Sequence, residues 1–278
     1  MTAEVERNLN FTKDSSTNVG FGDTYHRAIE EGFKSGKKEI LLPETFKAYG
    51  EAELMVWRPK VTEMETRPGF YNFNGFQATL MREGMDPVTQ SIANFKMCGM
   101  TVEQSHFALQ GGTVLHSEWD RKNEQKKFVY SRLDLSSPRP EGENYPIIRI
   151  NAKDLDMSRL LSKEDLVANQ KDKEELIANL QTGARIQVSV REKVNGALQF
   201  PKVYLQLNLL DDKTMGLSVT DAKGEELRVQ RQEVRSKMSP TLGMFVGEEN
   251  TKNLPQALLK MLENHKSPRI GGRGPSVA

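Results

Sequence analysis

Aromatic and positively charged side chains alternate along the segment Lys126 to Leu135, and that combination could bind a polyanion. If this segment is a β-strand, its period of two residues puts four of them on one face: Lys126, Phe128, Tyr130 and Arg132. Aromatic rings can stack on nucleic-acid bases of any sequence, and adjacent cations can neutralise phosphates. The pattern therefore predicts a surface for a single strand.

The segment Arg185 to Leu210 shows the same arrangement around a predicted β-hairpin. Asn195-Gly196 favours a two-residue type I′ turn, which requires positive φ at both central residues. Counting outward from that turn gives an apolar face made of four pairs: Val194 with Ala197, Val190 with Pro201, Val188 with Val203, and Ile186 with Leu205. The other face gathers Arg185, Gln187, Ser189, Arg191, Phe200, Lys202, Tyr204 and Gln206.

The aromatic and basic members of these two faces, with the loop before the first strand, are the candidate nucleic-acid-binding residues. Aromatic members would stack bases, and basic members would hold phosphates. The full set is Trp119, Arg121, Lys122, Lys126, Phe128, Tyr130, Arg132, Arg185, Arg191, Phe200, Lys202 and Tyr204. The alternative is that the rings are buried against a helix or another subunit, as aromatic residues most often are.

Turn and capping signals predict the elements that would position these faces. Besides the two strands of the predicted hairpin, strands are expected over seven segments: Leu54 to Glu65, Gly69 to Arg82, Thr113 to Trp119, Lys126 to Leu135, Tyr145 to Ile150, Met215 to Asp221 and Glu226 to Lys237. Helices are expected from Asp23 to a stop at Gly36, over Pro87 to Cys98, over Ser158 to Gln181 with a break near Asn169, and over Leu254 to Asn264.

These elements predict an α+β fold that is rich in β-strands. From Thr113 onward, the expected order is three strands, a helix and two strands. An oligonucleotide-binding (OB) barrel has the same order, although many α+β folds share it. We therefore expect an OB-like barrel or a curved antiparallel sheet with a few flanking helices.

Both ends of the chain are expected to lie outside this core. Residues 1–22 are rich in Asn, Ser and Thr and predict a flexible arm, and residues 266–278 predict a disordered tail. Between them, residues 23–265 are expected to form the globular core. A division of that core into subdomains 23–110 and 111–240 stays open.

The composition is that of an ordinary soluble protein and argues against a general polyanion binder. The 278 residues carry 39 Lys and Arg against 38 Asp and Glu, so any nucleic-acid site must be a local patch. Cys98 is the only cysteine, which favours an intracellular, cytoplasmic location, including the host cytoplasm for a phage protein. No apolar run approaches the ~20 residues of a membrane span, so no membrane partner is expected.

Motifs that would indicate an enzyme or a cofactor are absent from the sequence. It contains no phosphate-binding loop, no dinucleotide fingerprint and no Gly-x-Ser-x-Gly elbow, and one Cys with four His cannot supply a Cys₂His₂ zinc set. We therefore expect no catalytic residue, no metal and no cofactor. The remaining enzymatic alternative is a metal-dependent nuclease built around Asp211 and Asp212, which follow a strand.

The expected function is non-catalytic binding of single-stranded nucleic acid, DNA rather than RNA being favoured, with little sequence preference. Such a protein would support replication, recombination or transcription, for example in a phage or plasmid setting, and would form a homo-oligomer. The main alternative is a self-assembling viral or phage structural protein, or a protein-interaction protein, whose aromatic faces are subunit interfaces.

Overall fold

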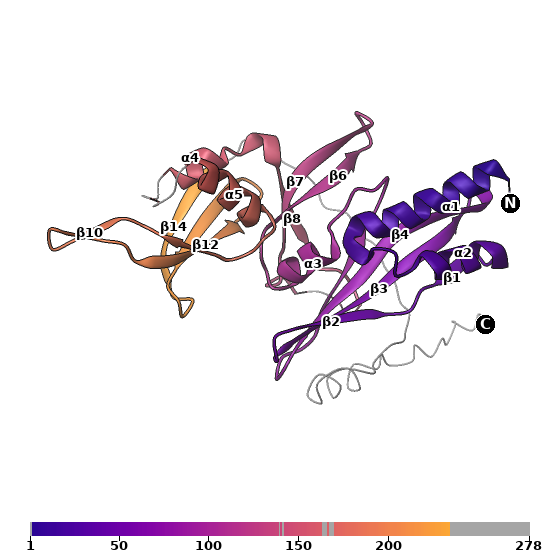
Figure 1. The fold of residues 1–278 in the computed structure, drawn as a ribbon, viewed down its shortest axis with the longest axis horizontal. Coiled ribbons are helices and arrows are strands. Elements are labelled where there is room, and N and C mark those ends of the chain that lie inside the picture. The colour runs from indigo at the N-terminus through magenta and orange to yellow at the C-terminus, as the bar shows by residue number, and fades with distance from the viewer. Residues whose placement is uncertain (1, 139, 141, 163–165, 167–169, 234–278) are drawn as a thin grey trace, which may run out of the picture.

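Antiparallel strands dominate the computed structural model, which describes residues 2–138, 140, 142–162, 166 and 170–233. The chain is a mixed α+β protein, as the sequence predicted. Figure 1 shows the N-terminal elements and the C-terminal sheet at opposite ends, with β6 (Val114–Asp120), β7 (Gln125–Leu133) and β8 (Ile147–Asn151) between them. The described strands form several antiparallel sheets and no closed barrel, which agrees with the predicted curved antiparallel sheet and not with an OB-like barrel.

The largest sheet is built around two long strands, which match two of the predicted ones closely. β3 (Glu53–Met64) and β4 (Arg67–Arg82) pair in an antiparallel hairpin, and β5 (Val88–Ala93) pairs with the other side of β4. β1 (Glu39–Leu41) and β2 (Thr45–Tyr49) both pair with the free side of β3. This sheet forms the floor on which the N-terminal helices pack.

The N-terminal segment is a helix, and the flexible arm predicted for residues 1–22 is wrong. α1 (Ala3–Ser16) continues into a π-helical turn (Thr17–Phe21) and packs on β4. Asn8 is buried, and its Nδ2 donates to the Tyr71 carbonyl at 2.9 Å while its Oδ1 accepts from the Tyr71 amide at 2.7 Å. The polar composition was misleading because several of these polar side chains satisfy buried backbone groups and do not face water.

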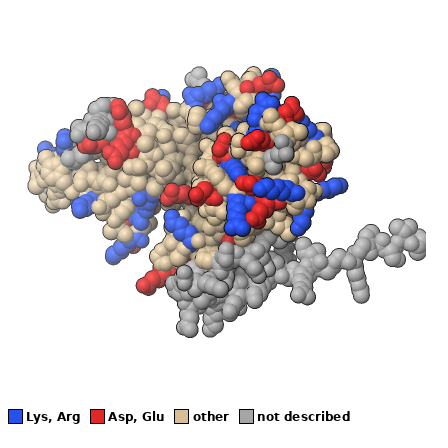
Figure 2. Space-filling view, turned by 45° about the vertical axis from the view of Figure 1, so that its right-hand side comes forward, with Lys and Arg blue, Asp and Glu red and all other residues tan. Residues whose placement is uncertain are grey.

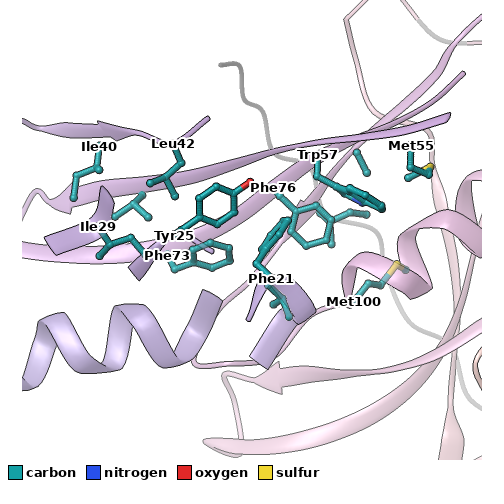
Figure 3. Close-up of a cluster of buried hydrophobic side chains, with 14 of the residues drawn as sticks. Phe21, Tyr25, Ile29, Ile40, Leu42, Met55, Trp57, Phe73, Phe76 and Met100 are labelled. Carbon is teal, nitrogen blue, oxygen red and sulfur yellow. The ribbon is translucent and has the colours of Figure 1, made fainter. Parts of the chain in front are cut away.

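A first hydrophobic cluster fills the space between the helices and this sheet. α2 (His26–Ser35) buries Ile29 and Phe33 and ends at Gly36, whose φ of 63° is left-handed, as the predicted helix stop requires. Figure 3 shows how aromatic rings from the π-helical turn and β4 meet beside α2. The ring centroid of Phe21 lies 5.1 Å from that of Tyr25 and 5.4 Å from that of Phe76.

The helix predicted over Pro87 to Cys98 is wrong. Its first half is β5, because pairing with β4 buries Gln90 and Ile92, and this pairing outweighs the local capping signal. The second half is a tight turn through Lys96 and Met97, whose φ values of 51° and 58° are left-handed. A helix begins only afterwards, at α3 (Val102–Leu109), with a capping box between Thr101 and Gln104.

The sheet of β6, β7 and β8 separates two hydrophobic clusters. Val114 and Leu133 pack into the first cluster from one face of this sheet. Tyr130 and Ile150 pack into the second cluster from the other face. Because side chains alternate along a strand, one short sheet supplies both cores.

The second cluster lies between a four-stranded sheet and two short helices. The sheet has the order β14–β13–β12–β9, with the bounds β9 (Ile186–Ser189), β12 (Lys202–Leu209), β13 (Thr214–Thr220) and β14 (Glu226–Glu233). A 3₁₀ turn (Ala152–Asp154) leads into α4 (Met157–Leu161), and α5 (Gln170–Gln181) follows. Within the segment Ser158 to Gln181 the described residues form α4 and α5, and the break expected near Asn169 lies outside the described residues.

The predicted hairpin forms in the predicted register. β10 (Glu192–Val194) and β11 (Ala197–Gln199) pair around Asn195 and Gly196, whose φ values are 51° and 83°. The register continues into the sheet, where Val188 lies opposite Val203. Residues 191–200 extend beyond the sheet as a two-stranded ribbon, the β10–β11 arm, which projects from one end of the molecule in Figure 1.

None of the described helices combines the length and apolar character that crossing a membrane would require. Three predictions lie outside the described residues: the helix from Leu254 to Asn264, the tail 266–278, and the end of the strand expected to reach Lys237.

Candidate nucleic-acid interface

The predicted binding residues are spread over two sheets and the β10–β11 arm. Those from the β6–β7 hairpin belong to the central sheet, and Arg185, Lys202 and Tyr204 lie on or beside the strands of the C-terminal sheet. Arg191 and Phe200 lie on the arm. Each group therefore has to be assessed on its own exposure and contacts.

Tyr130 does not lie on an exposed surface, so its assignment as a base-stacking residue is wrong, whereas the assignment of Arg132 stays a prediction. Tyr130 is 1% exposed, its hydroxyl accepts from Gln181 Nε2 at 2.9 Å, and burial raises the pKa of that hydroxyl. Arg132 is half-buried and donates to Asn208 Oδ1 at 3.3 Å and to the Leu210 carbonyl at 3.5 Å. Both residues join β7 to the C-terminal sheet and α5.

The outer end of the same face of β7 is exposed. Phe128 is 53% exposed, and Lys126 Nζ lies 5.5 Å from the centroid of its ring. Trp119 shares this face, because it lies directly opposite Lys126 in the β6–β7 ladder. Two rings and a cation predicted from the sequence are thus brought together at the tip of this hairpin.

The turn between β5 and α3 adds two residues that the sequence prediction missed. Phe95 is 44% exposed, and Arg121 Cζ lies 5.2 Å from its ring centroid. Lys96 Nζ lies 4.1 Å from the Trp119 ring centroid and 5.8 Å from that of Phe95. We define the tip surface as Phe95, Lys96, Trp119, Arg121, Lys126 and Phe128. An aromatic-cation pair was visible in Phe95-Lys96, but it fell within a segment predicted to be helical.

Hydrogen bonds hold this turn in place beside the hairpin. The backbones of Phe95 and Cys98 bond to each other in both directions, at 2.9 and 3.0 Å. Asn18 Nδ2 also donates to the Met97 carbonyl at 3.1 Å, which ties the turn to the N-terminal π-helical turn. The tip surface is therefore preorganised, and binding a ligand there would cost little ordering of the backbone.

Acidic groups next to the tip surface are engaged on the other side of the hairpin. Glu118 points to the opposite face of β6, where its carboxylate lies 2.8 Å from Arg149 Nε and 3.8 Å from Lys127 Nζ. The Asn123 side-chain amide donates to Asp120 at 2.9 Å and lowers the pKa of that carboxyl group. Asp120 also accepts from the backbone of Lys122, an exposed residue of the hairpin turn. Both carboxylates therefore have partners that do not belong to the tip surface.

Tyr204 and Arg185 form a smaller aromatic-cation pair on the C-terminal sheet. Arg185 Cζ lies 4.2 Å from the Tyr204 ring centroid, and its guanidinium donates to Thr220 Oγ1 at 2.8 and 3.1 Å. Gln187 Nε2 donates to the Tyr204 hydroxyl at 2.9 Å. Lys202 is exposed on the same strand. Because the Arg185 guanidinium is already held by Thr220, it is less available to contact a phosphate, and this pair is a weaker candidate for nucleic-acid binding.

The nuclease alternative gains no support from the described residues, since no group of three or more His, Cys, Asp or Glu among them could hold a metal ion. Asp211 Oδ1 instead accepts from the Lys213 amide at 2.8 Å and closes the turn between β12 and β13.

Surface charge is mixed on the face shown in Figure 2, where basic and acidic residues are interspersed without an extended field of one sign. This agrees with a net charge of +1 and restricts any polyanion contact to a local cluster such as the tip surface.

In comparisons with known proteins, no protein-family model matches the chain, and no match was found among curated proteins or solved structures.

Proposed function

We propose that the chain binds single-stranded nucleic acid at the tip surface, with little sequence preference and without catalysis. One observation supports this most directly: three rings that are at least partly exposed each lie within 6 Å of a cation, in the pairs Lys96–Trp119, Arg121–Phe95 and Lys126–Phe128. The rings come from the β5–α3 turn, β6 and β7, so each is a separate stacking position.

The physical basis is stacking combined with phosphate neutralisation. A base stacked on an exposed aromatic ring contributes about 1–3 kcal/mol irrespective of its identity. Cations beside the rings can contact the phosphates that flank a stacked base, and each such contact releases counterions. Duplex DNA presents no unstacked bases, so the tip surface should prefer single strands.

Tryptophan fluorescence provides a direct test of the site. The chain has two Trp residues; Trp57 is 3% exposed and donates to Ser105, whereas Trp119 is half-buried on the tip surface. Titration with a single-stranded oligonucleotide should quench Trp119, and Trp119→Phe should abolish the signal. The affinity should fall steeply as salt concentration rises, on a linear log–log plot.

Substitution of the two exposed rings tests the mechanism. Phe95→Ala and Phe128→Ala should each weaken binding about 5- to 150-fold in fluorescence anisotropy, the equivalent of 1–3 kcal/mol. Phe11→Ala is the matched control, because Phe11 is 40% exposed but lies on α1. Unchanged affinity in a folded Phe95→Ala/Phe128→Ala variant would exclude the tip surface, and absence of binding by the unaltered chain at low salt would exclude the function.

A further inference from the structure

The β10–β11 arm exposes apolar side chains beyond the edge of its own sheet. Leu198 is 57% exposed, Phe200 is 53% exposed and Val194 is 39% exposed. Lys193 lies opposite Leu198, so Lys193, Leu198 and Phe200 share one face of the ribbon. A two-stranded ribbon by itself is at best marginally stable in water, so this arm would gain stability from a surface to pack on.

A groove beside the base of the arm has the matching character. It has a volume of about 300 Å³ and lies between α5 and β9, the edge strand of the sheet formed by the described C-terminal strands. Its apolar lining comes from Leu166, Leu176, Ile186 and Val188, and its acidic lining from Asp172 and Glu175. The edge of β9 is also a template for pairing with another strand.

Arm and groove are complementary in both polarity and charge. The arm presents two large apolar side chains next to an ammonium group, whereas the groove presents apolar side chains next to carboxylates. Glu175 is exposed at the groove, and Lys193 is exposed on the arm. The carboxylate and the ammonium group can therefore form an ion pair without either one leaving a buried position.

The arm cannot fill the groove of its own molecule. It continues directly from β9, and Lys193 follows Ser189 by four residues, about 13 Å along an extended strand. In Figure 1 the arm projects away from α5 and the rest of the chain. The arm therefore points away from the groove next to its base. An arm that occupies this groove has to come from another molecule.

We propose that the β10–β11 arm of one copy of this chain binds in the α5–β9 groove of a second copy. Leu198 and Phe200 pack on the apolar lining, and Lys193 faces Glu175. Since each copy carries one arm and one groove, two copies exchange arms around a two-fold axis and bury both grooves. This self-association uses residues distinct from the tip surface, so it stands independently of the proposed nucleic-acid binding.

Sedimentation velocity tests the arm directly. The unaltered chain should form dimers as its concentration rises through the micromolar range, and Leu198→Asn with Phe200→Ser should shift it to monomers that keep the far-ultraviolet circular-dichroism spectrum of the folded chain. Leu227→Asn is the matched control, because Leu227 is 52% exposed on β14, at the opposite edge of the sheet. The proposal is overturned if the unaltered chain stays monomeric at every concentration. This holds also if the arm variants lose oligonucleotide binding instead.

A charge exchange tests the partner surface. Lys193→Glu alone and Glu175→Lys alone should each abolish most of the dimer, because each homodimer then opposes like charges. An equimolar mixture of the two variants should form heterodimers, since both arm-groove contacts again join opposite charges. Failure of the mixture to recover dimers while both variants remain folded would show that the arm does not occupy this groove.

Discussion

Phe128 and Tyr130 are two residues apart on the same face of β7, yet Phe128 is 53% exposed and Tyr130 is 1% exposed. The inner end of this face is covered by α5, whose Gln181 bonds to the Tyr130 hydroxyl, and by the second hydrophobic cluster. The outer end extends past that cover to the hairpin tip. One aromatic pattern therefore serves two purposes, packing at Tyr130 and surface contact at Phe128.

Alanine substitution should separate these two purposes. Tyr130→Ala removes a ring from a packed core and should lower the free energy of unfolding by about 3–5 kcal/mol. Phe128→Ala should change that free energy by no more than about 0.5 kcal/mol, because Phe128 is on the surface and 53% exposed. Urea denaturation measures both variants, and equal destabilisation would contradict the burial difference.

The contact between α1 and β4 depends on Asn8. Asn8→Ala should lower the free energy of unfolding by roughly 1–3 kcal/mol, because it leaves the buried Tyr71 amide without its partner. Thr12 also donates to the Tyr71 carbonyl, at 3.2 Å, so that acceptor stays satisfied. Asn10→Ala, at an exposed position of the same helix, is the control and should be nearly neutral by thermal denaturation. Similar melting temperatures for both variants would refute the role of Asn8.

Two glycines of β4 should respond differently to alanine. Both have left-handed φ values, +114° at Gly75 and +80° at Gly69, so each substitution costs about 1–2 kcal/mol in backbone strain. At Gly75 an added Cβ would also overlap the Ile92 carbonyl and lie 2.8 Å from the Asn94 amide, whereas Gly69 has open space within 4 Å. Gly75→Ala should therefore be the more destabilising by several kcal/mol in chemical denaturation. A small effect at Gly75 would mean that β4 and β5 can move apart at low cost.

Stability should depend on pH through His116. This side chain is 7% exposed, Nε2 pairs with Ser131 Oγ at 2.9 Å, and burial lowers the pKa of the imidazole. The unfolded chain, with a His pKa of about 6.5, binds the proton more readily than the folded chain. The contribution of neutral His116 is thus complete above about pH 6.5 and is lost as the pH falls towards the lower folded pKa. Urea denaturation of the unaltered chain and His116→Gln across that range should show a difference that grows as pH rises; a constant difference would disprove the assignment.

The sequence by itself determined the elements whose signals lie within a few residues. The positive φ required at Asn195 and Gly196 fixed both the hairpin and its register, because each later pair follows by counting. Alternation in β7 likewise identified which residues share a face. These features depend on backbone geometry and side-chain period, which are local properties.

Only the tertiary structure decided what covers each face. Tyr130 is buried by Gln181, 51 residues away, and α1 is ordered by the Tyr71 backbone, 63 residues from Asn8. Pairing with β4 likewise turned the expected helix at Val88–Ala93 into a strand and left Phe95 and Lys96 beside Trp119. Burial is set by partners distant in the chain, so a pattern confined to one segment could define a face but not whether solvent reaches it.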